Sequence, residues 1–385
     1  MNSMVEPTSK KDLFLDRIFT RQYYEAYDIT TKFVLQHTIA ILQKLKVESI
    51  LSSYASTEQI IAKVNLIDKS RLPLEWMFRS LSEAGYLESK AIDGVEHYKI
   101  CKTFPVPNHE EIAQEMIRVL WPSRDLISAA CGDYLHFLTG EKTGIEILFK
   151  GDRLKLWLDY FGNEHYLYSV FNTLGAYGVS KWWNSEQGVI LEVGGGTGAA
   201  ALSLLNSLRD IGLSGKIREY IFSDLSLILL RLGKQVLLEE SSDNLSITEK
   251  RLDFNKSLVD QGIEHGSVNV VYGVNALHVA NDLLFSLREI HQALAVGGMV
   301  VISEFARPSA TATLHPEVIF NLLDDFRCVK TEPDMRPAHG FLTPKHWQVL
   351  LQKAGFKNIE MMVNNDSGAP HHRQILAVVI KGQKM

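Results

Sequence analysis

The sequence contains little cysteine, and its cysteines lie far apart. The three residues, Cys101, Cys131 and Cys328, form no CxxC pair, so the spacing typical of a zinc site or a redox motif is missing. An odd number of scattered cysteines is also unlike a disulfide framework. We therefore expect a protein of a reducing compartment, the cytoplasm.

Neither glycine and proline nor charge of one sign is in excess. Glycine occupies 26 and proline 11 of the 385 positions, while 46% of the residues are hydrophobic, which excludes a collagen-like or disordered chain. The formal net charge of −5 gives no general attraction to nucleic acid or anionic lipid. No apolar run reaches the roughly 18 residues that span a bilayer, and residues 1–12 lack the apolar region of a signal peptide. We expect no membrane and no nucleic-acid partner.

The hydrophobic pattern changes near residue 180. Before it, apolar residues recur at three-to-four spacing, as in residues 33–45 and 74–87, which indicates helices. From residue 188 onward, strands alternate with helices, which is typical of a parallel sheet covered on both faces. Because 385 residues exceed the usual size of one domain, we predict two domains, residues 1–180 and residues 181–385.

One segment of the first region has the element order of a winged helix. Ser56-Thr57-Glu58 begins a short helix, Leu72-Pro73 begins a second, and residues 88–100 form a hairpin around Asp93-Gly94. DNA binding by such a unit needs a basic face, yet seven acidic residues match seven basic ones between residues 56 and 105. We therefore favour a dimerisation or lid role, and keep a cofactor-binding DNA regulator as an alternative.

The second region predicts seven strands and the helices that connect them. The strands are expected over residues 188–193, 220–223, 246–252, 268–274, 298–305, 356–363 and 374–381. The helices are expected over residues 197–208, 225–238, 282–294 and 343–354. The predicted fold class is α/β, a seven-stranded Rossmann-like sheet preceded by a mostly helical, winged-helix-like domain.

A glycine-rich turn, residues 192–198 with the sequence EVGGGTG, follows the first of these strands. In an open α/β sheet a ligand lies across the carboxyl ends of the strands, and the lack of side chains lets it reach the backbone. Gly194, Gly196 and Ala199 also fit the dinucleotide pattern G-x-G-x-x-G/A, so a nicotinamide is the rival ligand.

This turn resembles the first motif of class I S-adenosylmethionine-dependent methyltransferases, which implies a methyltransferase sheet. The cofactor-binding residues implied by the resemblance are Glu192, Gly194, Gly196, Gly198, Asp224, Asp253, Phe254 and Asn275. Glu192 would face the amino-acid end of the cofactor, Asp224 would accept from both ribose hydroxyls, and Asp253 and Phe254 would contact the adenine. Acids at three consecutive strand ends favour this cofactor, although Asp224 alone could be a helix N-cap.

Later motifs resemble the C-methyltransferase domains of polyketide synthases. They are residues 274–283 (VNALHVANDL), 294–298 (LAVGG), 302–304 (ISE) and 336–343 (RPAHGFLT). The resemblance implies methylation at the α-carbon of a malonyl or β-ketoacyl thioester in polyketide-type biosynthesis, with a small-molecule or carrier-protein-bound acyl substrate. It extends to the C-terminus but covers the helical half only loosely. An O-methyltransferase of a small hydroxylated metabolite is the second hypothesis, and a homodimer is compatible with both.

His278, Glu304 and Tyr166 are the candidate catalytic residues. His278 follows the fourth strand, and an imidazole can accept a proton at neutral pH. Glu304 lies 26 residues later in the chain, on the next strand about 4.8 Å away, where it could orient the imidazole. Tyr166, or equally Tyr168, could hydrogen-bond a substrate carbonyl. The alternatives are a strand-end histidine bonded to a backbone carbonyl and tyrosines that only pack.

His371, His372 and Gln374 could bind a divalent metal before the last strand. The arrangement resembles the metal-dependent C-methyltransferases of some polyketide loading modules, and nitrogen and oxygen ligands suit iron or manganese. Adjacent residues of a strand point to opposite faces, so both histidines can bind only if the backbone bends. The alternative is a solvated polar turn.

Overall fold

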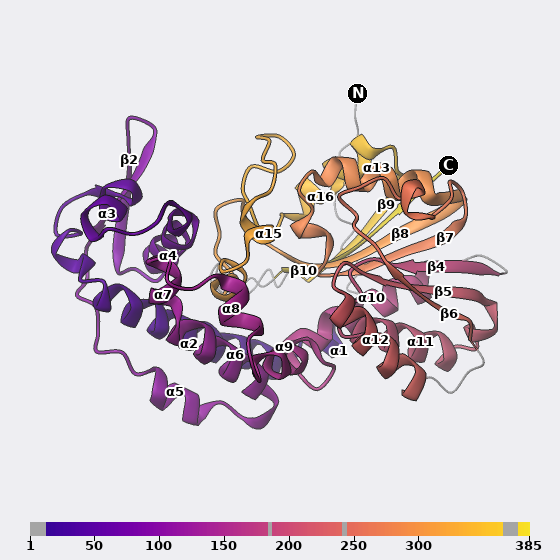
Figure 1. Cartoon of the computed structure of the whole chain (residues 1–385), viewed down its shortest axis with the longest axis horizontal. Helices are drawn as coiled ribbons and strands as arrows, with labels where there is room; N and C mark the ends of the chain where they lie inside the picture. Colours follow the sequence, from indigo (N-terminus) through magenta and orange to yellow (C-terminus); the bar gives the residue numbers. More distant parts are fainter. Residues whose placement is uncertain (1–12, 184–186, 241–244, 365–375) are drawn as a thin grey trace.

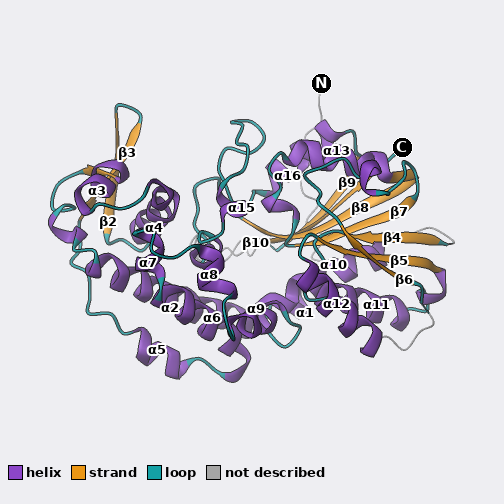
Figure 2. Ribbon diagram, in the orientation of Figure 1, coloured by secondary structure: helices purple, strands orange, loops and turns teal. Residues whose placement is uncertain are grey.

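The computed structural model describes residues 13–183, 187–240, 245–364 and 376–385. Helices and one small sheet form the first part of the chain, and a larger sheet between helices forms the second part (Figures 1 and 2). The predicted α/β fold class, with a helical N-terminal region, is confirmed.

The larger sheet contains the seven predicted strands. Their bounds are β4 Gly188–Glu192, β5 Ile217–Asp224, β6 Ile247–Arg251, β7 Val268–Val274, β8 Leu294–Ala306, β9 Lys357–Val363 and β10 Leu376–Gln383. The order across the sheet is β6-β5-β4-β7-β8-β10-β9. Strands β4 to β8 are parallel, and β10 lies antiparallel between β8 and β9. The carboxyl ends of the parallel strands therefore meet at one edge.

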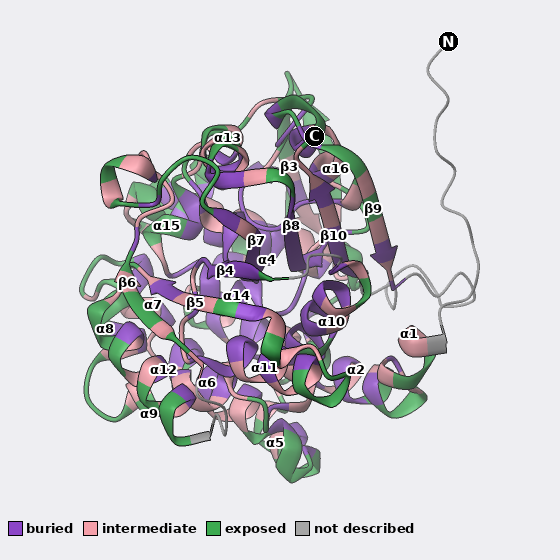
Figure 3. Cartoon of the chain, turned by 90° about the vertical axis from the view of Figure 1, so that its right-hand side faces the viewer, coloured by how far each residue is buried: buried purple, intermediate pink, exposed green. Residues whose placement is uncertain are grey.

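Two layers of helices cover this sheet (Figure 1). One layer consists of α10 (Tyr166–Trp182), α11 (Ala199–Asp210) and α12 (Leu227–Glu240), and the other of α13 (Leu283–Ala293) and α16 (Pro344–Ala354). Successive strand residues point to opposite faces. Ile190 accordingly packs in the core of the first layer and Leu191 in that of the second. The central strands are buried between the two layers (Figure 3).

Helix α11 begins later than the sequence predicted. Gly198 precedes it with a φ of +79°, a left-handed conformation that glycine adopts without strain. A Cβ atom at Gly198 would also lie 2.8 Å from the carbonyl oxygen of Gly233 in α12. Glycine therefore ends the turn and lets α11 and α12 approach closely.

The first part contains the helices that precede α10. They are α1 (Leu13–Ile18), α2 (Arg21–Lys44), α3 (Thr57–Val64), α4 (Arg71–Glu83), α5 (His109–Glu115), α6 (Trp121–Gly132), α7 (Tyr134–Leu138), α8 (Gly144–Phe149) and α9 (Arg153–Phe161). A small sheet of order β1-β3-β2 is formed by β1 (Ala55–Ser56), β2 (Leu87–Ile92) and β3 (Val95–Ile100). Elements α3, α4, β2 and β3 follow the predicted order, β1 was not predicted, and the description of the unit as a winged helix stays a prediction.

Two local signals in this unit act as the sequence indicated. Ser56 and Gln59 form a capping box at the start of α3, which satisfies two backbone donors. Asp93 and Gly94 have φ values of +51° and +78°, as a two-residue hairpin turn of type I′ requires.

A buried cluster joins the two parts of the molecule. Arg307, directly after β8, pairs with Glu317 of α14 (Glu317–Phe320), and Glu317 also accepts a hydrogen bond from Trp76 Nε1 of α4 at 3.0 Å. Helix α14 packs on α6, while α10 crosses residue 180 and contacts β8 and β10. The division at residue 180 stays a prediction.

Among the described helices, none is long and apolar enough to cross a membrane.

Candidate functional site

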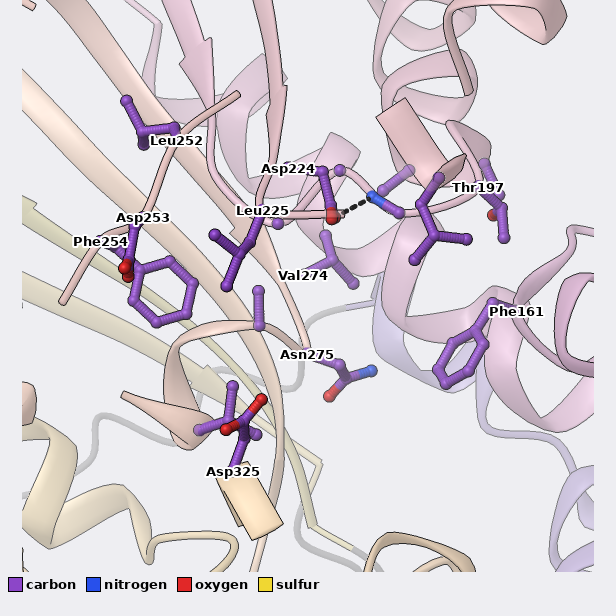
Figure 4. Close-up of a pocket in the computed structure, with 18 of the residues that line it drawn as sticks. Phe161, Thr197, Asp224, Leu225, Leu252, Asp253, Phe254, Val274, Asn275 and Asp325 are labelled. Atoms are coloured by element: carbon purple, nitrogen blue, oxygen red, sulfur yellow. Dashed lines mark hydrogen bonds between the residues drawn. The ribbon is translucent and has the colours of Figure 1, made fainter. Parts of the chain in front are cut away.

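A cavity of about 530 Å³ lies at the carboxyl ends of the parallel strands (Figure 4). Ligands bind at this edge in open α/β sheets. Six of the predicted cofactor-binding residues line the cavity: Gly194, Gly196, Asp224, Asp253, Phe254 and Asn275. The structure therefore brings together residues that are more than 80 positions apart in the chain.

The turn after β4 requires glycine. Gly194 and Gly196 have φ values of +66° and +54°, which other residues adopt only at a cost. A Cβ atom on Gly194 would lie 2.6 Å from that of Ala276, and one on Gly195 would lie 2.2 Å from the ring of Phe222. The turn thus presents bare backbone to the cavity.

Asp224, the last residue of β5, is fixed by two backbone N–H groups. Gly196 N donates to Oδ2 at 2.9 Å, and Ser226 N donates to Oδ1 at 2.7 Å. Burial raises the pKa of this carboxyl group. Each carboxylate oxygen has a second lone pair, so the group can still accept from two hydroxyls. It is not the N-cap of α12, which begins at Leu227.

Asp253 and Phe254 follow β6 and lie side by side at the cavity (Figure 4). Asn255 N donates to Asp253 Oδ1 at 3.0 Å, and Lys256 Nζ lies 3.3 Å from Oδ2. Lys256 therefore offsets part of the carboxylate charge, and a ligand would share its oxygens with these two partners.

Asn275 places its side-chain amide at the cavity. Its backbone has a φ of +46°, and its Oδ1 accepts a hydrogen bond from Phe305 N at 2.8 Å. Its Nδ2 is buried and makes no hydrogen bond of normal geometry among the described residues, although the amide interacts with the Tyr168 hydroxyl. A ligand acceptor at this position would share the amide with Tyr168.

The opposite wall of the cavity comes from other elements. Trp157 and Phe161 of α9, Tyr168 of α10 and Asp325 of α15 (Asp324–Arg327) line it. Figure 4 shows Phe161 and Asp325 across from the strand ends. Sequence reasoning missed Trp157, Phe161 and Asp325, because aromatic residues at helical spacing are typical of core and no motif marks the acid.

His278 and Glu304 form a buried pair beside this cavity. His278 Nδ1 lies 2.8 Å from Glu304 Oε2, and the side chains are 3% and 0% exposed. An ionised carboxylate only accepts, so Nδ1 is the donor in this pair, and a neutral imidazole in that tautomer has its lone pair on Nε2. Glu304 Oε1 accepts from the N–H groups of Ala276, Leu277 and His278 at 3.0–3.3 Å. The structure brings the predicted base and its predicted partner together.

Aromatic rings surround the imidazole of His278. The ring centroids of Phe341, Phe326 and Phe320 lie 4.5, 5.8 and 6.3 Å from its own. Ala276 and Val279 line the cavity, whereas His278 does not. The imidazole therefore lies against phenylalanine rings, next to residues that line the cavity.

Besides His278 and Glu304, three further predicted site residues are not among the described residues that line the cavity: Glu192, Gly198 and Tyr166. Glu192 is buried and accepts a hydrogen bond from the Tyr220 hydroxyl at 2.9 Å. Tyr166 begins α10 as predicted, but its hydroxyl lies 3.2 Å from Thr20 Oγ1. Tyr168, the other candidate of that motif, faces the cavity instead. The roles of all three residues stay predictions.

Glu192→Gln is expected to flatten the dependence of stability on pH. Burial raises the pKa of Glu192 from 4.5 to about 8, so between these values the folded state binds more protons than the unfolded state and stability falls as pH rises. The glutamine amide of the variant does not ionise, so the variant avoids this loss of stability. The loss is on the order of 2 kcal/mol once relaxation around the ionised group is allowed for. Thermal unfolding of the cofactor-free protein from pH 5 to 9 measures it.

The control for that experiment is Glu249→Gln, which changes an exposed carboxylate on β6, two strands away in the same sheet. It should leave the slope unaltered. A Glu192→Gln protein whose melting temperature still falls with pH as in the parent would contradict the prediction.

The predicted metal ligands, His371, His372 and Gln374, lie outside the described residues. Within the described ranges, no group of three or more His, Cys, Asp or Glu residues could hold a metal ion. Metal binding therefore stays a prediction.

A family model described as a methyltransferase domain matches residues 164–361, slightly more than half of the chain. The chain belongs to the methyltransferase family. The matched range contains the glycine turn, the acids at the strand ends and the His278–Glu304 pair. The protein is an S-adenosylmethionine-dependent methyltransferase, as the resemblance of the glycine turn implied.

This methyltransferase is similar to a polyketide synthase in sequence and to carbon methyltransferases in structure. Polyketide synthase PksR of Bacillus subtilis is 25% identical over 244 residues, which cover 62% of this chain and 9% of PksR. The chain thus spans less than a tenth of that curated relative. CurJ carbon methyltransferase has a TM-score of 0.81 at 18% identity, with 97% of this chain and 96% of that chain covered. The citrinin polyketide synthase CMeT domain has a TM-score of 0.74 at 17% identity, with 100% and 99% covered.

The residues at the cavity fit S-adenosylmethionine. The cavity volume of about 530 Å³ is typical of small-ligand sites, the glycine turn leaves room beside the backbone, and the Asn275 side chain faces the cavity. Asp224 and Asp253 would hold the nucleoside through its hydroxyl and amino groups. When bound, this cofactor supplies an electrophilic methyl group.

Proposed function

We propose that this methyltransferase acts on the α-carbon of an acyl thioester, malonyl or β-ketoacyl, in polyketide-type biosynthesis, with His278 as the base. The observation that carries the proposal is the buried pair of His278 and Glu304 beside the cofactor cavity. The similarity to PksR and to structures of carbon methyltransferases supports it.

The geometry suits removal of a proton from carbon. His278 Nε2 accepts the α-proton, which is acidic because the adjacent carbonyl groups delocalise the charge left on carbon. Glu304 retains the Nδ1–H bond and stabilises the imidazolium ion. The apolar rings around His278 keep water from returning a proton to the carbanion.

An intact-mass assay tests this proposal. The protein is incubated with the isotope-labelled methyl donor and, separately, malonyl-carrier protein, acetoacetyl-carrier protein and a panel of phenols. A labelled mass gain on an acyl-carrier protein is the expected result. A gain on phenols alone would overturn the proposal in favour of O-methylation of a small hydroxylated metabolite.

The helical part is proposed to act as a lid, with residues 1–180 and 181–385 as the two functional units. Trp157 and Phe161 on the cavity wall support a covering role. Dimerisation is the alternative role of the helical part. Light scattering of the purified chain distinguishes a dimer from a monomer.

Asp224→Ala is expected to weaken binding of the methyl donor or its demethylated product by about 1–3 kcal/mol, because a buried acceptor for ribose hydroxyls is lost. Calorimetry measures the change, and neither protein should bind NADH. Asp210→Ala, an exposed acid at the end of α11, is the matched control. Equal affinity of the Asp224→Ala and parent proteins would remove Asp224 from the cofactor site.

A divalent metal, iron or manganese, at His371, His372 and Gln374 is the remaining element of the proposal. Its physical basis is charge: deprotonating a malonyl-type acceptor places a carbanion beside a carboxylate, and a cation bound to substrate oxygens offsets this. Chelation of untagged protein is expected to abolish activity on the malonyl substrate. Activity that survives complete metal removal, together with a fully active His372→Ala variant, would rule out this role.

A further inference from the structure

Arg336 opens the RPAHGFLT segment and donates to the loop that carries His278. Its Nη1 donates to the carbonyl oxygen of Ala280 at 2.7 Å, and its Nη2 donates to the carbonyl oxygen of His278 itself. The side chain is 2% exposed. A buried guanidinium directed at the main chain of the base serves no part of the function described so far.

We propose that Arg336 is a positioning residue for the base. It fixes the short 3-10 turn Leu277–Val279 from its carbonyl side, while Glu304 fixes the same turn from its N–H side. The inference rests on the proposed function, because it takes His278 as the group that accepts the proton.

The turn depends on such external partners. Within it, Val279 N donates to Ala276 O at 3.4 Å and Ala280 N donates to Leu277 O at 3.0 Å. Three successive N–H groups, of residues 276–278, use Glu304 Oε1 instead. The carbonyl groups of His278 and Ala280 bond to Arg336, so removal of the guanidinium leaves two buried acceptors unpaired.

Arg336 is itself held rigidly against this loop. Glu332 and Arg336 exchange two backbone hydrogen bonds of 2.8 Å, and Lys330 N donates to Asn281 O at 2.7 Å. Lys330 Nζ also lies 3.1 Å from Asp282 Oδ2. The segment 330–336 is thereby tied to the residues that follow the turn. Burial lowers the pKa of Arg336 to about 10, so it remains cationic at neutral pH.

Phe341 of the same segment packs against the imidazole of His278. Gly340 has a φ of +76°, and a Cβ there would lie 2.7 Å from the Phe326 ring and 2.9 Å from Arg307 Nη2. Phe341 follows and places its ring centroid 4.5 Å from that of His278. Arg336 therefore holds the main chain of the base, and Phe341 covers its ring.

Arg336→Met tests the inference, because methionine keeps an unbranched stem as far as the position of Nε and removes the guanidinium donors. We expect kcat to fall about 10²-fold, since a displacement of about 1 Å has that effect on a reacting group. The acceptor KM and the cofactor Kd should change less than about twofold, since Arg336 is not among the described residues that line the cavity. Arg336→Lys, which retains one cationic donor, should recover part of the rate.

A double-mutant cycle with His278→Ala decides the mechanism. If Arg336 acts through His278, Arg336→Met causes no further loss in the His278→Ala protein. The control is Arg153→Met, which removes a guanidinium that donates to the carbonyl oxygen of Ile147 and pairs with Asp133, neither of which belongs to the turn that carries the base. It should leave kcat unchanged.

Other outcomes separate the inference from the function on which it rests. The positioning role would be overturned if Arg336→Met lowered kcat by the same factor in the parent and in the His278→Ala protein. A rise in KM at constant kcat would overturn it as well. Full activity of His278→Ala would overturn the proposed base. If thermal unfolding shows that the Arg336→Met protein is not folded, Arg336→Lys replaces it in the same double-mutant cycle, with the same criteria.

Discussion

Replacement of His278 by alanine is expected to lower kcat about 10²–10⁴-fold, the usual contribution of a general base, while cofactor affinity stays nearly unchanged. The imidazole is bonded to Glu304 and enclosed by phenylalanine rings, and it does not line the cofactor cavity. Its loss therefore removes the proton acceptor and not the cofactor site. Initial rates at saturating donor, with calorimetry of the demethylated product, measure both quantities.

Glu304→Gln should also lower this rate. The amide oxygen can still accept from the backbone N–H groups that now bond to Oε1, but the amide NH2 group then faces His278 Nδ1, which loses its acceptor, and the neutral amide cannot stabilise an imidazolium charge. A matched control is His265→Ala, because His265 is exposed and precedes the same strand, β7, at its opposite end. An His278→Ala enzyme with parental kcat would exclude His278 as the base.

The sheet and the strand-end site could be predicted because both follow from local sequence. Buried strands give continuous apolar runs, and the parallel order then brings residues from separate strands to one edge. His278 and Glu304 are an example. They are 26 positions apart in the chain, but His278 follows β7 and Glu304 lies in β8, and these two strands are neighbours in the sheet. Strand spacing alone indicated that their side chains could meet.

Contacts between the two parts could not be predicted in this way. Tyr166 and Tyr168 are both on α10, two positions apart, and residues at that spacing lie on different faces of a helix. Only the packing of α10 on the sheet decides that Tyr168 faces the cavity while Tyr166 contacts Thr20. Glu192 is a similar case, since its hydrogen bond to Tyr220 depends on a side chain of the neighbouring strand that no motif specifies.

Replacement of Glu317 by alanine is expected to lower the free energy of unfolding by about 3–5 kcal/mol, the range for removing one partner of a buried ion pair. Glu317 and Arg307 are 0% and 1% exposed, so the variant leaves a buried guanidinium without its counter-charge. Trp76 Nε1 and Leu314 N would lose their acceptor as well. Urea unfolding followed by tryptophan fluorescence measures the loss and includes Trp76 as a local reporter.

Two further variants show whether the loss comes from the unpaired charge. Glu25→Gln breaks an exposed pair with Arg21 on α2, and such surface pairs contribute little, so no measurable change is expected. The double variant Arg307→Met/Glu317→Leu removes both charges and should recover most of the stability, because apolar residues of similar size can replace a buried pair. If the double variant were as unstable as Glu317→Ala, the hydrogen bonds to Trp76 and Leu314, and not the charge of Arg307, would account for the joining of the helical part to the sheet.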